Sequence, residues 1–304
     1  MEALMRNMFQ SLAKNQPANR LAKKYGLRLG AARFVAGESI GMAIDAVKRL
    51  NKEGKVVTLD HLGEFISTEA EAVESAAMCM QTLDAIAEAK AESNLSLKMT
   101  SLGLDISREL CMKNMRNILD RAKSYGNFVR IDMEDFGHCQ ESIDIYKELR
   151  QEYDNVGIVL QAYLYRTEGD IADLNNLHAN LRLVKGAYKE SPSVAFPEKK
   201  DVDENFKKII EQHLLNGNYA AVATHDEAMV EHTKTVVKQH GIPKDQFEFQ
   251  MLYGICEELQ DRLVKEGYKV RVYVPYGIDW FGYFMRRLAE RPANVWFIVK
   301  NFFK

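Results

Sequence analysis

Cysteines, prolines and long apolar runs are all scarce in this chain of 304 residues. The four cysteines are widely spaced and form neither a CxxC pair nor a cysteine–histidine pattern, which argues against a zinc site and predicts reduced thiols in a cytoplasmic protein. With only 6 prolines and no low-complexity linker, one compact domain is favoured over two. No stretch approaches the roughly 20 apolar residues of a membrane span, and the N-terminus lacks the apolar segment of an export signal.

An excess of either charge is also missing. The 41 basic and 43 acidic residues give a formal net charge of -2. Such a chain has no overall field that attracts nucleic acid, so we expect no nucleic-acid partner. Hydrophobic residues make up 46% and charged residues 28%, which is typical of a globular protein with a substantial core.

The sequence pattern changes near residue 50. Residues 1–50 show helical periodicity without a convincing strand, and they predict an N-terminal helical extension. In residues 51–304, helical stretches separate short apolar runs, and eight of these runs are candidate strands: 56–59, 95–99, 128–133, 156–160, 181–184, 220–223, 247–251 and 270–274. Eight strand–helix units without a GxGxxG motif predict an α/β fold of the (β/α)8 TIM-barrel type.

Polar residues gather at the carboxyl ends of the predicted strands, where barrel enzymes carry their active sites. These residues are Asp60, His61, Lys98, Thr100, Asp132, Glu134, Asp135, Gln161, Tyr163, Arg182, Lys185, Thr224, His225, Asp226, Gln250 and Tyr273. Alternation directs five of them into the barrel, namely Lys98, Asp132, Gln161, Arg182 and Tyr273. Buried polar groups need partners or a ligand, so we expect a binding site at this end.

Residues 181–188 (LRLVKGAY) are the most unusual segment. Alternation places Arg182, Gly186 and Tyr188 on one face, and Gly186 leaves a gap there that a flat ring or a small anion would fit. The same residues also suit an edge strand or a strand terminus, so the segment alone leaves both interpretations open.

Two other polar groups have alternative interpretations. Asp132 either caps the following helix or pairs with Lys98 and holds its ammonium toward the barrel mouth as an anion ligand. The triplet Thr224-His225-Asp226 either ligates a metal or recognises a cofactor. The lack of an HxH pattern favours the cofactor.

A helix is predicted over residues 283–290 (YFMRRLAE), directly after the eighth strand. Glu290 lies four residues after Arg286 and three after Arg287, so it can orient either guanidinium group. This is either a solvated salt-bridge face or, near the barrel mouth, a clamp for a carboxylate. The aromatic residues that would form the walls of a small apolar pocket beside it are Tyr188, Tyr273 and Tyr283.

Several of these segments carry a resemblance to a known family. The motifs are LKMT (97–100), IDMED (131–135), VLQAY (159–163), RLVKGAY (182–188), ATHD (223–226), RVYVPYG (271–277) and YFMRRLAE (283–290). With them the chain resembles the proline dehydrogenases, and it looks most like a stand-alone bacterial member. The resemblance implies a (β/α)8 barrel that binds FAD. It also implies oxidation of L-proline to 1-pyrroline-5-carboxylate by hydride transfer to flavin N5, the first step of proline catabolism.

The resemblance also implies roles for individual residues. It assigns the proline carboxylate to Lys98, Arg286 and Arg287, and the pyrrolidine pocket to Tyr188, Tyr273 and Tyr283. The catalytic candidates are Arg182, beside flavin N5, and Asp132, in support of Lys98. The flavin contacts are Met133, Gln161, Arg182, Lys185, Gly186, Ala187, Thr224, His225 and Glu290. One departure is Asp226, which stands where many members of the family carry Asn.

The resemblance implies partners as well. They are a quinone electron acceptor and a separate pyrroline-5-carboxylate dehydrogenase that consumes the product. The apolar segment 295–303 would either touch a bilayer as a peripheral contact or pack on the core as the last barrel helix.

Two other functions are compatible with a polar barrel mouth. In a class I aldolase, Lys98 or Lys185 would form a Schiff base with a carbonyl substrate. In a binding protein without catalysis, the inward charges would hold a flavin or an anion without turnover. A bound flavin that proline bleaches distinguishes the oxidoreductase from both.

Overall fold

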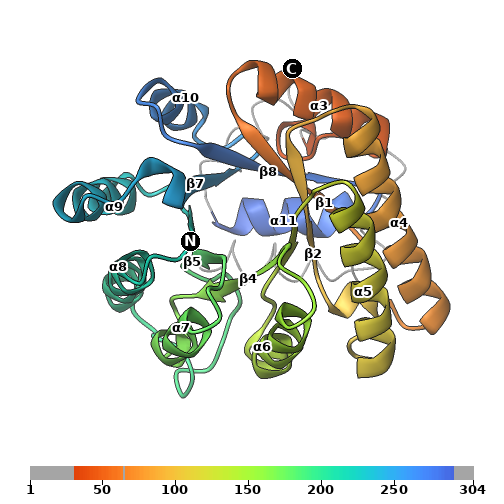
Figure 1. Ribbon diagram of the computed structural model, residues 1–304, viewed down its shortest axis with the longest axis horizontal. Coiled ribbons are helices and arrows are strands. Elements are labelled where there is room, and N and C mark those ends of the chain that lie inside the picture. Colours follow the sequence, from red (N-terminus) through yellow and green to blue (C-terminus); the bar gives the residue numbers. More distant parts are fainter. Residues whose placement is uncertain (1–30, 64–65, 291–304) are drawn as a thin grey trace.

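A closed barrel of eight parallel strands forms the centre of the protein (Figure 1). The computed structural model describes residues 31–63 and 66–290, except for the side chains of residues 286–290. The strands are β1 (Val56–His61), β2 (Ser93–Leu97), β3 (Val129–Ile131), β4 (Val156–Gln161), β5 (Leu181–Val184), β6 (Ala220–Ala223), β7 (Phe247–Leu252) and β8 (Val270–Tyr276). All eight strands and the (β/α)8 barrel were predicted from the sequence, and the structure confirms them.

Among the described residues, one helix precedes the first strand, and one helix follows each of the eight strands. The helices are α3 (Ile40–Lys52), α4 (Glu69–Glu88), α5 (Arg108–Ser124), α6 (Phe136–Arg150), α7 (Thr167–Asn175), α8 (Lys199–Leu215), α9 (Glu227–His240), α10 (Glu257–Lys265) and α11 (Trp280–Glu290), with 3-10 turns at Ala31–Arg33, Thr100–Leu102 and Lys244–Gln246. Local sequence sets where these helices begin. Thr68 and Glu71 form a capping box at α4, for example, and the Asp226 side chain caps α9.

The segment expected as an N-terminal extension is described only from residue 31 onward. Within it, α3 packs against the first and last strands of the barrel. Ala43, Ile44 and Val47 join the apolar side chains of β1 and β8 in one buried cluster. Burial of this amphipathic face holds α3 on the barrel wall where β8 meets β1.

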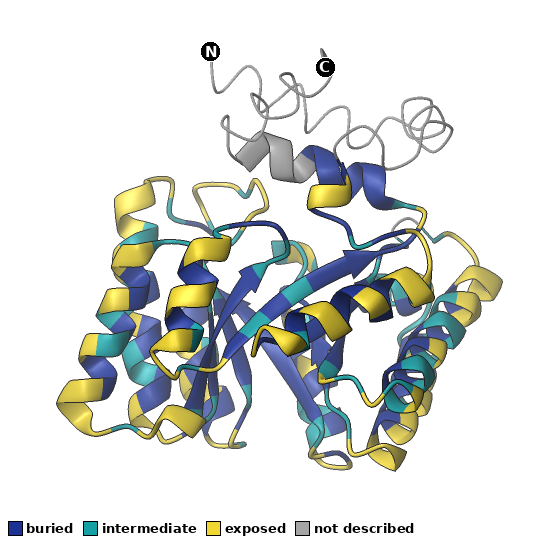
Figure 2. Ribbon diagram, turned by 90° about the horizontal axis from the view of Figure 1, so that it is seen from above, coloured by how far each residue is buried: buried dark blue, intermediate teal, exposed yellow. Residues whose placement is uncertain are grey.

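The main apolar core lies between the strands and the surrounding helices, and Figure 2 shows the buried strands enclosed by half-exposed helices. The residues inside the barrel are different. Strand β7 alternates Phe247 and Phe249, which are fully buried in that core, with Glu248 and Gln250, which are equally buried but bonded to polar partners. A barrel interior filled by charged and amide groups departs from the branched aliphatic layers typical of this fold.

Helix α11 lies across the carboxyl end of the barrel (Figures 1 and 2). Its residues Trp280, Tyr283 and Phe284 pack with Phe34 and Leu62 in a second buried cluster. The indole of Trp280 also donates to Glu38 at 3.0 Å. Together these contacts place α11 above the strand ends, where the sequence predicted it.

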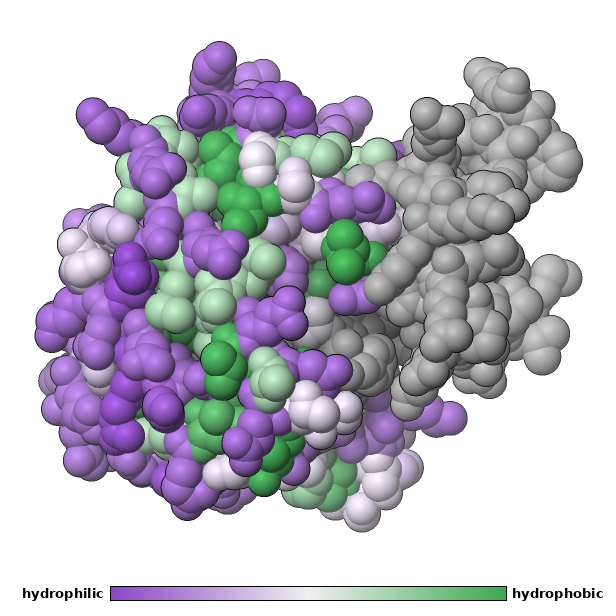
Figure 3. All heavy atoms as spheres, turned by 90° about the vertical axis from the view of Figure 1, so that its right-hand side faces the viewer, coloured by the Kyte–Doolittle hydropathy of each residue, from purple (hydrophilic) through white to green (hydrophobic). Residues whose placement is uncertain are grey.

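The outer surface is mostly hydrophilic on the side that carries α4 and α5, with hydrophobic residues in scattered groups (Figure 3). Over residues 31–63 and 66–290, no helix combines the length and the apolar character needed to cross a membrane. The apolar segment 295–303 lies outside the described residues.

Candidate active site

A buried ion pair near the carboxyl ends of the strands organises the candidate site. Arg182 of β5 donates from Nη1 to Oδ1 of Asp132, just after β3, at 2.6 Å. Ser96 of β2 donates to the same oxygen at 2.7 Å, and the Tyr273 hydroxyl of β8 donates to Oδ2 at 2.7 Å. The guanidinium also lies over the Tyr273 ring, 5.3 Å from its centroid. These strands are not all neighbours, so the bonds cross the barrel interior and fix the site from several sides.

Lys98 has a different partner from the one expected. Its ammonium lies 3.3 Å from Oδ2 of Asp60 on β1, whereas Asp132 pairs with Arg182. The predicted Lys98–Asp132 pair is therefore wrong. Strand β2 lies between β1 and β3, and the ammonium of Lys98 pairs with the carboxylate on the β1 side, that of Asp60. Both members of the Lys98–Asp60 pair are largely buried, which keeps a fixed cation at the barrel mouth.

The alternative role of Asp132 as a helix cap is also wrong. The cap of α6 is Asp135, whose carboxylate accepts from the backbone N–H of His138. Between these two aspartates, Glu134 accepts from the backbone and the hydroxyl of Thr100 at 3.1 and 2.5 Å. Burial raises the pKa of Glu134, so its carboxyl group is another titratable group at this end of the barrel.

The gap predicted beside Gly186 is filled by the protein itself. A Cβ built on Gly186 would lie 2.2 Å from the Tyr163 ring, and the backbone φ of +107° is a conformation that favours glycine. The Tyr163 N–H donates to the Lys185 carbonyl at 2.9 Å, so the loops after β4 and β5 are joined. The expectation that a ligand ring occupies this gap is wrong, since Tyr163 packs there.

Lys185 points away from the ion pair and toward two helices. Its ammonium donates to Asp203 of α8 at 2.5 Å and to Asp226, the cap of α9, at 2.7 Å. Asp226 is therefore engaged in a cap and an ion pair. Both carboxylates engage the ammonium in ion pairs that join the loop after β5 to α8 and α9, which gives Lys185 a structural role.

The Thr224–His225 segment joins neighbouring strands. The Thr224 N–H donates to the Gln250 carbonyl at 3.0 Å, and Nε2 of His225 accepts from the Leu252 N–H at 2.9 Å. An accepting Nε2 carries no proton, so a neutral His225 has its proton on Nδ1. The segment lies at the barrel mouth and presents polar groups there.

The other predicted site residues lie at different depths. Met133 and Gln161 are buried at the strand ends, and Tyr283 is buried in α11. Ala187 and Tyr188 are exposed on the loop after β5, with Tyr188 at 40% exposure, so this tyrosine belongs to the rim. The backbones of Arg286, Arg287 and Glu290 belong to α11, but their side chains lie outside the described residues.

Several buried polar atoms near the mouth have no partner in the described part of the chain, the Tyr163 hydroxyl among them, and two belong to residues of β4 and β5. These two are Nη2 of Arg182 and Oε1 of Gln161, in side chains that are 4% and 3% exposed. Gln161 uses its amide nitrogen on the Glu134 carbonyl, at 3.1 Å. An unpaired donor and an unpaired acceptor in a buried position are free to bond to ordered water or to a ligand that supplies both kinds of group.

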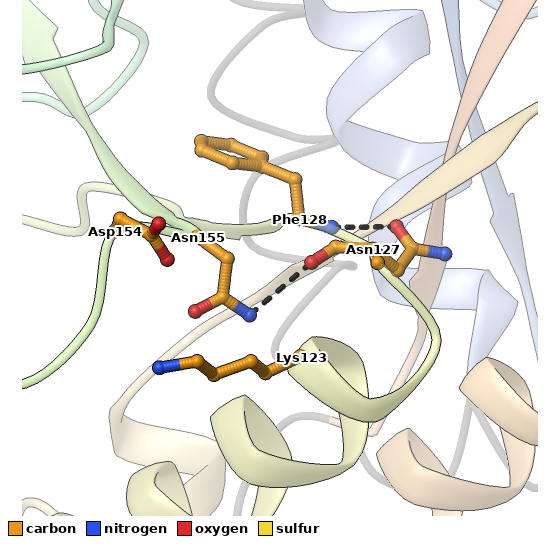
Figure 4. Close-up of a pocket in the computed structure, with 6 residues that line it drawn as sticks. Lys123, Asn127, Phe128, Asp154 and Asn155 are labelled. Carbon is orange, nitrogen blue, oxygen red and sulfur yellow. Dashed lines mark hydrogen bonds between the residues drawn. The ribbon is translucent and has the colours of Figure 1, made fainter.

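A surface hollow exists at the other end of the barrel, between α5 and the starts of β3 and β4 (Figure 4). Phe128, Lys123 and Asp154 line it, and Asn155 donates across it to the Asn127 carbonyl at 3.2 Å. The hollow is separate from the ion pair of Arg182 and Asp132, because it lies at the amino ends of the strands.

Sequence reasoning missed three members of the polar interior, which are Ser96, Glu248 and Arg271. They bond to the predicted residues or extend their network. Asp60 was expected at the strand ends, but its pairing with Lys98 was not predicted. A usable signal was present in the alternation of charged and apolar residues along β7 and β8. A charge at an inward position of a fully enclosed strand indicates a partner across the barrel.

Comparisons with known proteins extend over nearly the whole chain. A family model described as "Proline dehydrogenase" matches residues 43–300. The chain is 52% identical over 301 residues to proline dehydrogenase 1 of Bacillus subtilis, covering 99% of this chain and 100% of that protein. It is 44% identical over 308 residues to the proline dehydrogenase of Deinococcus radiodurans, covering 100% and 99%.

A solved structure is similar over most of the barrel. It is proline utilization A from Bdellovibrio bacteriovorus inactivated by N-propargylglycine, with a TM-score of 0.81 and 28% identity. The match covers 86% of this chain but only 32% of that longer protein. The described barrel therefore corresponds to one part of that protein.

Proposed function

Since the chain belongs to the proline dehydrogenase family, we propose that it oxidises L-proline to 1-pyrroline-5-carboxylate with a bound FAD as the redox cofactor. The observation that carries the proposal is the unpaired Nη2 of the buried Arg182, held at the barrel mouth by Asp132. Full-length similarity to stand-alone proline dehydrogenases supports the substrate.

The polar mouth of the barrel fits a flavin. A flavin ring edge carries both hydrogen-bond donors and acceptors, which match the orphan donor of Arg182 and the orphan acceptor of Gln161. We propose that these two residues hold the cofactor together with Met133, Thr224, His225 and the backbone of residues 185–187. When bound, FAD supplies the acceptor for the hydride that leaves proline.

The protein groups have distinct tasks in this proposal. Arg182 places a fixed positive charge at the cofactor, and Asp132 holds the guanidinium in place. The Lys98 ammonium, held by Asp60, offers a cation for the proline carboxylate. We propose that Arg286 and Arg287 complete the carboxylate clamp, with Glu290 orienting them, and that Tyr188, Tyr273 and Tyr283 line the pocket for the ring. Fixing the carboxylate orients the carbon that loses hydride.

Oxidation also requires the proline amine in its neutral form, because the nitrogen lone pair forms the new C=N bond. The cations that bind the carboxylate lower the pKa of the neighbouring ammonium by charge repulsion. Turnover should therefore rise with pH until the bound amine is neutral. The loss of one proton and one hydride yields the imine product.

The electron acceptor and the cellular context are further proposals. We propose that a quinone reoxidises the cofactor and that a separate pyrroline-5-carboxylate dehydrogenase consumes the product. A cytoplasmic protein with peripheral contact to a membrane would meet both requirements, since quinones are lipid-soluble.

The proposal is tested with purified protein. Extraction and mass spectrometry should identify FAD, and L-proline should reduce an artificial dye with formation of pyrroline-5-carboxylate. The aldolase alternative instead predicts a flavin-free protein that borohydride traps covalently with a carbonyl substrate, at Lys98 or Lys185. Bound FAD without any dye reduction by proline would support the non-catalytic binding protein.

A further inference from the structure

A continuous chain of hydrogen bonds runs through the barrel interior below the candidate site. We call Asp132, Arg182, Gln250, Glu248 and Arg271 the polar column. Arg182 donates from Nη1 to Asp132 and from Nε to Oε1 of Gln250, both at 2.6 Å. Gln250 donates to Glu248 at 2.5 Å, and Arg271 donates to Glu248 at 2.6 Å. The column links the barrel mouth to its lower half through two ion pairs and one amide.

The partners of Gln250 fix the direction of its amide. The guanidinium of Arg182 only donates, so it must meet the carbonyl oxygen of the amide, and the Glu248 carboxylate only accepts, so it must meet the amide nitrogen. Burial raises the pKa of Glu248, but Arg271, Lys269 and the Gln250 amide together lower it to about 2 and keep the carboxylate charged. A reversed amide would therefore direct its NH2 group at the Arg182 donor and its carbonyl oxygen at the Glu248 carboxylate, and neither contact would be a hydrogen bond.

Two bonds, at Nε and Nη1, determine the plane of the Arg182 guanidinium. Ser96 also lies within 3.2 Å of Nη1, so that nitrogen is fully engaged. With Gln250 removed, the guanidinium keeps its hydrogen bonds at Nη1 and its contact with the Tyr273 ring, but it loses the bond at Nε that limits rotation about Nη1. Nη2, the nitrogen without a partner in the described part of the chain, is the one whose direction would change.

We propose that Gln250 is a positioning residue, which aligns Arg182 so that Nη2 stays directed to a ligand at the barrel mouth. The inference rests on the proposed function only for the identity of that ligand. Gln250 itself acts through Arg182, and the charged Glu248 fixes the amide from the other side.

Two substitutions separate positioning from packing. Gln250→Leu keeps most of the volume but offers no acceptor to Nε. Gln250→Glu reproduces the native bonds only when protonated, because its carbonyl can then accept from Arg182 while its hydroxyl donates to Glu248. When ionised, it would place a second carboxylate against Glu248. The Glu248 charge raises the pKa of the new carboxyl group and the Arg182 guanidinium lowers it, so these two neighbours offset each other and burial leaves the pKa raised. Tyr219→Phe is the matched control, since it removes a 2.8 Å bond to the far oxygen of Glu248 and leaves Gln250 intact.

The first measurement is thermal stability as a function of pH, with the FAD-loaded protein. A carboxyl group whose folded pKa is raised loses stability as pH rises from its unfolded value of about 4.3 to its folded value. Gln250→Glu should thus fall progressively below the native protein over this range, whereas the melting temperature of Gln250→Leu should differ from the native value by a constant amount. Parallel profiles for the two variants would overturn the assigned amide geometry.

The second measurement separates kcat from KM. Gln250→Leu should lower kcat roughly 10- to 100-fold with a nearly native proline KM, as a misaligned catalytic group does. Gln250→Glu should approach native kcat at low pH and lose it as pH rises, while Tyr219→Phe stays near native. Native kcat in Gln250→Leu would overturn the proposal. If the native protein does not oxidise proline, the proposed function fails, but the stability profiles still decide whether Gln250 holds Arg182.

Discussion

Removal of the Asp132 carboxylate is expected to destabilise the protein strongly. Asp132 is 9% exposed and accepts bonds from Arg182, Ser96 and Tyr273, all between 2.6 and 2.7 Å. Asp132→Ala would leave the Arg182 cation buried without a carboxylate. Breaking a buried pair in this way costs about 3 to 5 kcal/mol, several times more than a surface pair.

Urea unfolding at saturating FAD measures this loss as the difference in unfolding free energy from the native protein. Asp173→Asn is the control, because it breaks an exposed pair with Lys147 and should leave the unfolding free energy unchanged within error. The double variant Asp132→Ala/Arg182→Met should be less destabilised than the sum of its single changes, since no unpaired charge remains. A single-variant loss below about 1 kcal/mol, or additive losses in the double variant, would refute the assigned pair.

Three further predictions concern neighbouring groups. Because the pKa of Glu248 is held at about 2, below an unfolded value of about 4.3, the unfolding free energy of the native protein should fall as pH drops through that window. Glu248→Gln should have a lower unfolding free energy at neutral pH and a weaker dependence on pH in acid titrations. Gly186→Ala should cost roughly 1 to 3 kcal/mol through strain and contact with Tyr163. Gly186→Ala should lower the unfolding free energy by less in a protein that also carries Tyr163→Ala. An equal loss with and without Tyr163→Ala would exclude the contact between residue 186 and the Tyr163 ring. Lys185→Met should lower the melting temperature but keep proline-dependent turnover, whereas complete inactivation with bound FAD would restore this lysine as a catalytic candidate.

The strands were predictable because short segments with continuous or alternating apolar residues lie between helical segments. The run 181–184 coincides with β5, and 220–223 coincides with β6. Alternation also identified Arg182 as an inward residue, because Leu181 and Leu183 face the surrounding core. Fold class and the direction of single side chains therefore follow from local sequence.

The partners of those side chains were less predictable. Lys98 has a carboxylate available on each neighbouring strand, and the choice of Asp60 depends on barrel geometry rather than on spacing along the chain. Gly186 shows the same limit: the missing side chain indicated space, but the residue that fills it, Tyr163, follows a different strand. Which side chains meet across a closed barrel depends on the register and tilt of all the strands and on side-chain length. The sequence of a single strand does not determine these.

The most direct test of the proposed function is anaerobic mixing of the purified protein with L-proline while the absorbance of its bound flavin is recorded. We expect the oxidised flavin spectrum to bleach in proportion to proline until the cofactor is reduced, with one pyrroline-5-carboxylate formed per flavin. A folded, FAD-loaded protein whose spectrum is unchanged at saturating proline would contradict the account.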